Sequence, residues 1–206
     1  NAVFDQFDRN VHIRKDLEWW SPSEAIHVAI DFNVAIMAAS AFALRGDQIH
    51  WLWETQGTAN TDELCRKIKE DFPNRKIIVY PDPSGKARKS SAALSVTDFS
   101  ILRDAGFTIR ARTAHPGIKD SVNAVNRLLQ SAAGNTSMFF AADLKGLLRS
   151  IEGTQWVEKR NSEDLDNATI DKSGGVEHYS DGVRYACDYL FPIRAGSSGA
   201  RRGARF

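Results

Sequence analysis

The stretch that decides the fold is Ile26-His27-Val28-Ala29-Ile30-Asp31-Phe32-Asn33. Apolar residues lead directly into an aspartate, and this pattern predicts a buried strand that ends in a carboxylate. A buried carboxylate is costly in free energy unless it is paired, hydrogen-bonded or bound to a metal ion. Asp31 is therefore the first candidate for a functional side chain, and a turn or cap residue is the alternative interpretation.

A second unit of the same kind occurs at Lys76-Ile77-Ile78-Val79-Tyr80-Pro81-Asp82. If the two strands are neighbours in one sheet, Asp31 and Asp82 lie close together at one edge. Adjacent carboxylates repel each other, and a divalent cation is the usual remedy. The pair therefore predicts a metal-dependent site. A plain turn aspartate is the alternative for Asp82, because Pro83 follows it and Gly85 is close by.

The periodicity of the remaining chain predicts a mixed α/β fold. The alternation of Trp51 and Trp53 is typical of a half-buried strand, and Leu64, Ile68 and Phe72 fall on one helical stripe. Strands are expected at 26–31, 34–44, 48–55, 75–80 and 107–111, and helices at 60–72, 94–105, 119–133, 143–151 and 179–191. Three antiparallel strands followed by parallel ones make a sheet of five strands, or slightly more, with helices on both faces.

Acidic residues mark three positions in this pattern. Asp31 and Asp82 end the first and fourth strands, and Asp181 begins the last helix. This arrangement suits a ribonuclease H-like fold, in which the first strand lies beside the fourth. Asp181 then closes the site, although an N-cap of the last helix is an equally good interpretation of that residue.

Composition narrows the classes of function. The chain has 206 residues and a net charge of +1, so its overall field says little about partners. Cys65 and Cys187 are far apart, which favours a reducing compartment over a disulfide scaffold. The longest apolar run, residues 34–44, is too short to cross a bilayer. The chain begins with Asn1 rather than Met, and we expect a piece of a longer protein.

The sequence Gly85-Lys86 does not complete a phosphate-binding loop. Tyr80 stands where that motif needs its first glycine, and Ala87 stands where it needs serine or threonine. A nucleoside triphosphate site is therefore not predicted at this loop.

The same loop is basic. Lys86, Arg88 and Lys89 follow the second acid, and Arg110 and Arg112 lie near the end of the fifth expected strand. Such residues are usually part of a solvated loop. Beside a metal-dependent site that acts on a nucleic acid they would become candidates for contacts with DNA phosphates.

The acids match the needs of phosphodiester hydrolysis. The reaction needs a nucleophile at neutral pH and neutralisation of charge on the phosphate, and two magnesium or manganese ions roughly 3.5–4 Å apart supply both. These hard cations prefer oxygen ligands, so carboxylates are suitable residues.

Five short stretches occur in an order that is more specific than any one of them. They are Phe7-Asp8-Arg9-Asn10-Val11-His12, Ile30-Asp31-Phe32-Asn33-Val34, Tyr80-Pro81-Asp82-Pro83-Ser84-Gly85, Asp120-Ser121-Val122-Asn123-Ala124-Val125-Asn126 and His178-Tyr179-Ser180-Asp181. Together they resemble the C-terminal nuclease domain of the large terminase subunit of tailed bacteriophages, over most of residues 4–192.

The resemblance implies a ribonuclease H-like endonuclease that cuts concatemeric double-stranded viral DNA during genome packaging. It implies Asp31, Asp82 and Asp181 as catalytic residues and ligands of two divalent ions, Mg²⁺ or Mn²⁺. It also implies an ATPase domain in the same full-length chain, a small terminase subunit and a portal protein as partners, and no membrane. The expected location is the cytoplasm of the infected bacterial host, outside the finished virion.

The resemblance also suggests a division of the chain. Residues 1–25 are expected to lead in from the ATPase domain with little regular structure, residues 26–192 to form the nuclease domain, and residues 193–206 to form a disordered basic tail. His178 and Asn33 are candidates for a layer behind the metal ligands, with packing as the alternative for His178.

Other acidic residues are further candidates for metal ligands. They are Asp164, Asp166 and Asp171 in the polar segment 158–176, and Asp188, which is expected to be solvated. Asp120 is expected to interact with its helix dipole.

Two rival functions use the same features. The first is a junction resolvase or transposase-like nuclease on the same fold, which a four-way junction substrate would separate from a packaging nuclease. The second is a non-catalytic module that docks to DNA or a portal, for which replacement of Asp31 would change no activity.

Overall fold

The computed structural model describes residues 1–32, 37–86, 96–157 and 169–193. Several predicted positions lie outside these residues, namely Asn33, Arg88, Lys89, Asp164, Asp166 and nearly all of the tail. Within the described ranges, no helix combines the length and apolar character needed to cross a membrane.

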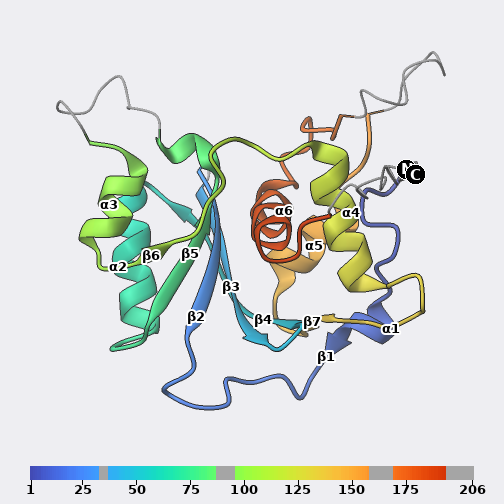
Figure 1. The fold of residues 1–206 in the computed structure, drawn as a ribbon, viewed down its shortest axis with the longest axis horizontal. Coiled ribbons are helices and arrows are strands. Elements are labelled where there is room, and N and C mark those ends of the chain that lie inside the picture. Colours follow the sequence, from blue (N-terminus) through green and yellow to red (C-terminus); the bar gives the residue numbers. More distant parts are fainter. Residues whose placement is uncertain (33–36, 87–95, 158–168, 194–206) are drawn as a thin grey trace, which may run out of the picture.

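The fold is a mixed seven-stranded sheet with helices on both faces (Figure 1). The strands are β1 (Ile13–Arg14), β2 (Ile26–Asp31), β3 (Met37–Arg45), β4 (Gln48–Thr58), β5 (Ile77–Pro81), β6 (Thr108–Ile109) and β7 (Met138–Ala141), in the spatial order β1-β7-β4-β3-β2-β5-β6. The helices are α1 (Arg9–His12), α2 (Thr61–Asp71), the 3₁₀ turn η1 (Pro83–Lys86), α3 (Asp98–Asp104), α4 (Ile118–Leu129), α5 (Lys145–Gly153) and α6 (His178–Leu190).

The centre of the sheet confirms the predicted topology. Strand β2 pairs antiparallel with β3, and β3 pairs antiparallel with β4. On its other side β2 pairs parallel with β5, and β5 pairs parallel with β6. The hairpin between β3 and β4 turns at Gly46, whose φ of +68° is a conformation that glycine adopts without strain. The first and fourth predicted strands are therefore neighbours.

The far edge of the sheet was not predicted. Strand β7 pairs parallel with β4, and the two-residue strand β1 pairs parallel with β7. The first 25 residues thus contain a helix and a strand, and Val3 and Phe4 are buried. The physical reason is that β4 would otherwise expose a row of unpaired backbone groups, which short edge strands can cover.

Side-chain alternation divides the core into two parts. Ile26, Val28 and Ile30 of β2 pack with α2 and α3 on one face, whereas Ala29 belongs to the core formed with α4, α5 and α6. Successive strand residues point to opposite faces, so Asp31 shares the α6 side with Ala29. Figure 1 shows these two helical layers on either side of the sheet.

Several predicted helix boundaries shift in the structure, and side-chain caps explain two of them. Helix α2 begins at Thr61 rather than at residue 60, because Asn60 is the N-cap and its side chain accepts a hydrogen bond from the backbone N–H of Glu63. Helix α3 begins at Asp98 rather than near residue 94, where Thr97 and Ser100 form a capping box. Such side-chain caps satisfy backbone donors that the helix itself leaves free.

Helix α6 approaches the backbone of β2 closely at Gly182. A Cβ atom at this position would lie 3.5 Å from the carbonyl carbon of Ala29 and 3.5 Å from the backbone nitrogen of Ile30. These are ordinary contact distances, so one methyl group fits and a larger side chain does not. A small residue here lets the helix lie directly on the strand that carries Asp31.

We expect Gly182→Ala to fold with unchanged or slightly higher stability, because alanine favours the helix. Gly182→Leu should lower the free energy of unfolding by about 1–3 kcal/mol, since overpacking separates α6 from β2. Urea denaturation of both variants and the wild type measures the difference. Equal stability of Gly182→Leu and the wild type would contradict the close approach.

Candidate metal centre

Asp31 and Asp82 come together because their strands are parallel and in register. Ile30 lies opposite Pro81, and the backbone N–H of Asp82 continues the ladder with a 2.9 Å hydrogen bond to the carbonyl of Ile30. Both residues are buried, with exposed fractions of 7% for Asp31 and 8% for Asp82. The sequence pattern therefore predicted their proximity correctly.

Asp181 joins them from the first turn of α6. The helix begins at His178 and Glu177 occupies the N-cap position, so an N-cap role for Asp181 is excluded. Its carboxylate is 2% exposed and accepts two charge-assisted hydrogen bonds. Arg184 Nη2 donates to Oδ1 at 2.5 Å, and Lys172 Nζ donates to Oδ2 at 2.8 Å.

One cleft of about 670 Å³ contains all three acids. Ser84 and His115 line it beside Asp82, while Lys172 and Arg184 line it beside Asp181. The three predicted ligands thus share one solvent-accessible space at the carboxyl ends of β2 and β5. Their roles as ligands stay a prediction.

Asp82 is fixed through a single carboxylate oxygen. Its Oδ1 accepts a 2.7 Å hydrogen bond from the backbone N–H of Ser84 and another, also 2.7 Å, from His115 Nε2. The first bond is a turn contact, so the alternative interpretation of Asp82 describes part of its role. Within the described part of the chain, Oδ2 has no hydrogen bond and faces the cleft with its lone pairs free.

The charge of Asp31 is opposed by its surroundings. Burial raises the pKa of Asp31 to about 7, and the carboxylates of Asp181 and Asp82 contribute to the same shift. His178 lies beside it, with Nδ1 3.4 Å from Asp31 Oδ2. His178 is itself buried, which suits the predicted place behind the ligands.

Arg184 anchors Asp181 from inside the protein. Its side chain is 6% exposed, and Nη1 donates a 2.9 Å hydrogen bond to Ser121 Oγ on α4. A buried guanidinium held on two sides orients the carboxylate that it pairs with. The sequence contained a signal for the pair of Asp181 and Arg184, because residues three apart on a helix lie side by side. His115 and Lys172 had no comparable signal.

The predicted DNA-binding residues that the structure describes already have partners. Lys86 Nζ donates to the backbone carbonyl of Arg112 at 2.7 Å, and Arg110 Nη1 lies 3.2 Å from the hydroxyl of Tyr80. Arg112 forms an ion pair with Asp188. DNA binding by these residues stays a prediction.

Two of the open acids have structural contacts. Asp188 is 4% exposed, so the expectation of a solvated side chain was wrong: the pair with Arg112 compensates its burial. Asp171 accepts a hydrogen bond from the backbone N–H of Ser173 at 2.9 Å, which explains the lowered pKa of Asp171.

The residues fit a divalent cation by charge and by donor type. Carboxylates converge on one cleft, and burial together with their mutual repulsion raises the pKa of Asp31. Hard cations take such oxygen ligands and remove this repulsion. In the described ranges, no three His, Cys, Asp or Glu side chains already stand in ligand geometry.

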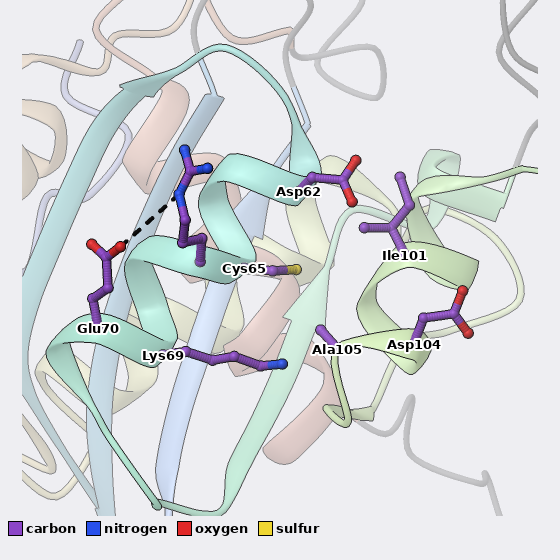
Figure 2. A pocket seen from close by; sticks show the side chains of 8 residues that line it. Asp62, Cys65, Lys69, Glu70, Ile101, Asp104 and Ala105 are labelled. Carbon is purple, nitrogen blue, oxygen red and sulfur yellow. Dashed lines mark ion pairs between the residues drawn. The ribbon is translucent and has the colours of Figure 1, made fainter.

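A separate cavity of about 510 Å³ lies between α2 and α3 (Figure 2). Asp62, Cys65 and Lys69 face it from α2, opposite Ile101 and Asp104 of α3. Burial raises the pKa of Cys65 to about 11, so the thiol is a poor nucleophile. None of the predicted site residues lines this cavity.

In metal-free buffer, Asp31→Asn should change how stability depends on pH. The pKa of Asp31 is about 7 in the folded chain against an ordinary 3.8, so the folded protein binds more protons than the unfolded protein between these values. Stability therefore falls as pH rises through that window, by on the order of 1 kcal/mol per pH unit, and a neutral asparagine removes this loss.

Urea denaturation in EDTA tests the prediction. The stability gained by Asp31→Asn over the wild type should be larger near pH ~7 than near pH ~5. A gain of equal size at both pH values would contradict the electrostatic assignment.

Known proteins resemble this chain in structure rather than through sequence matches. No family model matches it, and no curated protein matches it. Among solved structures, a large terminase from a thermophilic bacteriophage superposes with a TM-score of 0.68 over 92% of this chain, at 16% sequence identity. That match covers 45% of the terminase, so the chain spans a little under half of that relative's length.

Isolated nuclease domains superpose over nearly their whole length. The P22 large terminase nuclease domain has a TM-score of 0.62, 13% identity and 93% coverage of both chains. The large terminase nuclease of the thermophilic phage G20c with bound magnesium has a TM-score of 0.59 and 11% identity, over 90% of this chain and 97% of that chain. From these superpositions, the chain has the ribonuclease H-like fold of large terminase nuclease domains.

Proposed function

We propose that this chain is a metal-dependent endonuclease domain that cuts concatemeric double-stranded viral DNA during genome packaging. The observation that carries the proposal is the convergence of Asp31, Asp82 and Asp181 on one cleft, in a fold shared with large terminase nuclease domains. The G20c relatives contain magnesium in one structure and cobalt in another. We extend this to two Mg²⁺ or Mn²⁺ ions in the present chain.

In this proposal Asp31, Asp82 and Asp181 hold the cations. Two such ions supply Lewis acidity toward the phosphate and a nucleophile at neutral pH. The chain's own residues orient the ligands. His115 and the backbone N–H of Ser84 hold Asp82 through Oδ1 and leave Oδ2 toward the cleft.

The other two ligands are oriented in the same manner. Arg184 holds Asp181 through Oδ1 from the buried side, and Ser121 holds Arg184. His178 lies behind Asp31 and restricts where that carboxylate can move. Preorganised ligands of this kind avoid the cost of ordering them when the reaction occurs.

Recognition of DNA belongs to the same proposal. Lys86, Arg110 and Arg112 follow strands that end at the acidic edge, where their charges favour a phosphate backbone. Few aromatic residues interleave with them, so we expect contacts with the backbone rather than with base edges.

The wider context follows the large terminases. We propose that the nuclease domain, predicted over residues 26–192 and extended here by β1 and the buried Val3 and Phe4, is joined to an ATPase domain in the full-length chain, with a small terminase subunit and a portal protein as partners. The proposed place of action is the cytoplasm of the infected bacterial host.

Plasmid cleavage tests the proposed activity. The wild type should cut supercoiled DNA with Mn²⁺ or Mg²⁺, and EDTA should abolish cleavage. Asp31→Asn should lower the rate by at least about a hundredfold, because a metal ligand contributes several kcal/mol to stabilising the transition state. The matched control is Asp47→Asn, an exposed acid in the β3–β4 turn, which should cut like the wild type.

Two results would contradict the proposed function. If the wild type neither cuts DNA nor binds Mn²⁺ in calorimetry, the nuclease proposal is wrong and the docking module replaces it. If a four-way junction is cut far faster than linear duplex, the resolvase alternative replaces it.

A further inference from the structure

The two cations that hold Asp181 are not equivalent. Arg184 is 6% exposed and also bonded to Ser121, so it cannot leave without exposing a buried charge pair. Lys172 is 62% exposed and reaches Asp181 Oδ2 from the wall of the cleft. Its compact ammonium on a flexible stem can move away at little cost.

Lys172 lies among more negative charge than one aspartate provides. Burial opposes its ionisation, yet the pKa of Lys172 is raised because the carboxylates of Asp181, Asp31 and Glu177 attract its charge. Glu177 is 3% exposed, and its Oε2 is buried without a hydrogen-bond partner among the described residues. The ammonium therefore acts as an internal counter-ion in the cleft where a divalent cation is expected.

A divalent cation and Lys172 need the same oxygen. Oδ1 of Asp181 belongs to Arg184, so Oδ2 is the atom that remains for a metal. Two cations at one carboxylate oxygen also repel each other. A metal at Oδ2 would therefore displace the ammonium of Lys172 from Asp181.

We propose that Lys172 exchanges partners, neutralising Asp181 while the metal is absent and contacting a DNA phosphate when the metal is bound. This inference rests on the proposed function. In this proposal the positive charge of Lys172 has two roles. It neutralises Asp181 in the metal-free protein, and it positions a DNA phosphate in the metal-bound protein. A phosphate is the anion that a nuclease brings to this place, and lysine is a common point-charge partner for it.

Metal binding without DNA tests the first half. In calorimetry, Lys172→Met should bind Mn²⁺ about tenfold more tightly than the wild type, the change expected when one charge-assisted hydrogen bond no longer competes. The matched control is Lys15→Met, which removes the same charge from an exposed residue beyond β1, with β7, β4 and β3 between it and β2. Equal or weaker Mn²⁺ binding by Lys172→Met, relative to Lys15→Met, would overturn the proposal.

DNA binding tests the second half. DNA binding is measured with Ca²⁺ in place of Mn²⁺, and gels check that the duplex stays intact. Lys172→Met should bind a short duplex more weakly than the wild type. The slope of log affinity against log salt should become shallower by about the contribution of one phosphate contact. Lys172→Arg keeps the charge and should keep the wild-type slope. If Lys172→Met has the slope of Lys15→Met, the partner exchange is refuted.

The outcomes separate this inference from the nuclease proposal. Wild-type protein that binds no Mn²⁺ and cuts no DNA overturns both. Wild-type protein that binds Mn²⁺ and cuts DNA, with Lys172→Met unchanged in both titrations, overturns only the role of Lys172.

Discussion

The candidate site depends on two carboxylates that the sheet forces together. Strands β2 and β5 are parallel and in register, and both are buried on both faces, so the ends of these strands cannot move apart without breaking the core. Asp31 and Asp82 must therefore be neighbours. Their repulsion, with that of Asp181, acts against folding and contributes with burial to the raised pKa of Asp31.

The surrounding donors reduce this repulsion and leave the cleft open. Arg184 approaches Asp181 from the interior, and His115 and the Ser84 N–H approach Asp82 through one oxygen. These donors therefore orient each carboxylate through its Oδ1 atom alone. The remaining capacity faces the cleft, except where Lys172 occupies Asp181 Oδ2. A binding site needs acceptors that are open in this manner, whereas a fully satisfied structural ion-pair network leaves no acceptor facing solvent-accessible space.

The sequence predicted the centre of the fold and of the site because physical signals there are strong. A run of apolar residues ending in Asp31 or Asp82 specifies both a buried strand and the position of its acid. Strands β1 and β7 were missed, since two to four residues carry no measurable periodicity and pairing depends on the edge that β4 offers. His115 and Lys172 were missed because loop paths set by tertiary contacts bring them to the acids. Asp188 was wrongly expected to be solvated because its partner is distant in sequence.

Low sequence identity separates what the fold requires from what the site requires. At 13% identity the fold matches the P22 nuclease domain over 93% of both chains, so the fold itself needs little more than an apolar pattern. A packed fold gains nothing from an aspartate at position 31, where burial and two neighbouring carboxylates oppose its charge. An apolar or amide side chain of similar size would be more stable there. A residue that lowers stability at the mouth of a cleft is best explained by what it binds, and carboxylates that converge without enough internal positive charge bind cations.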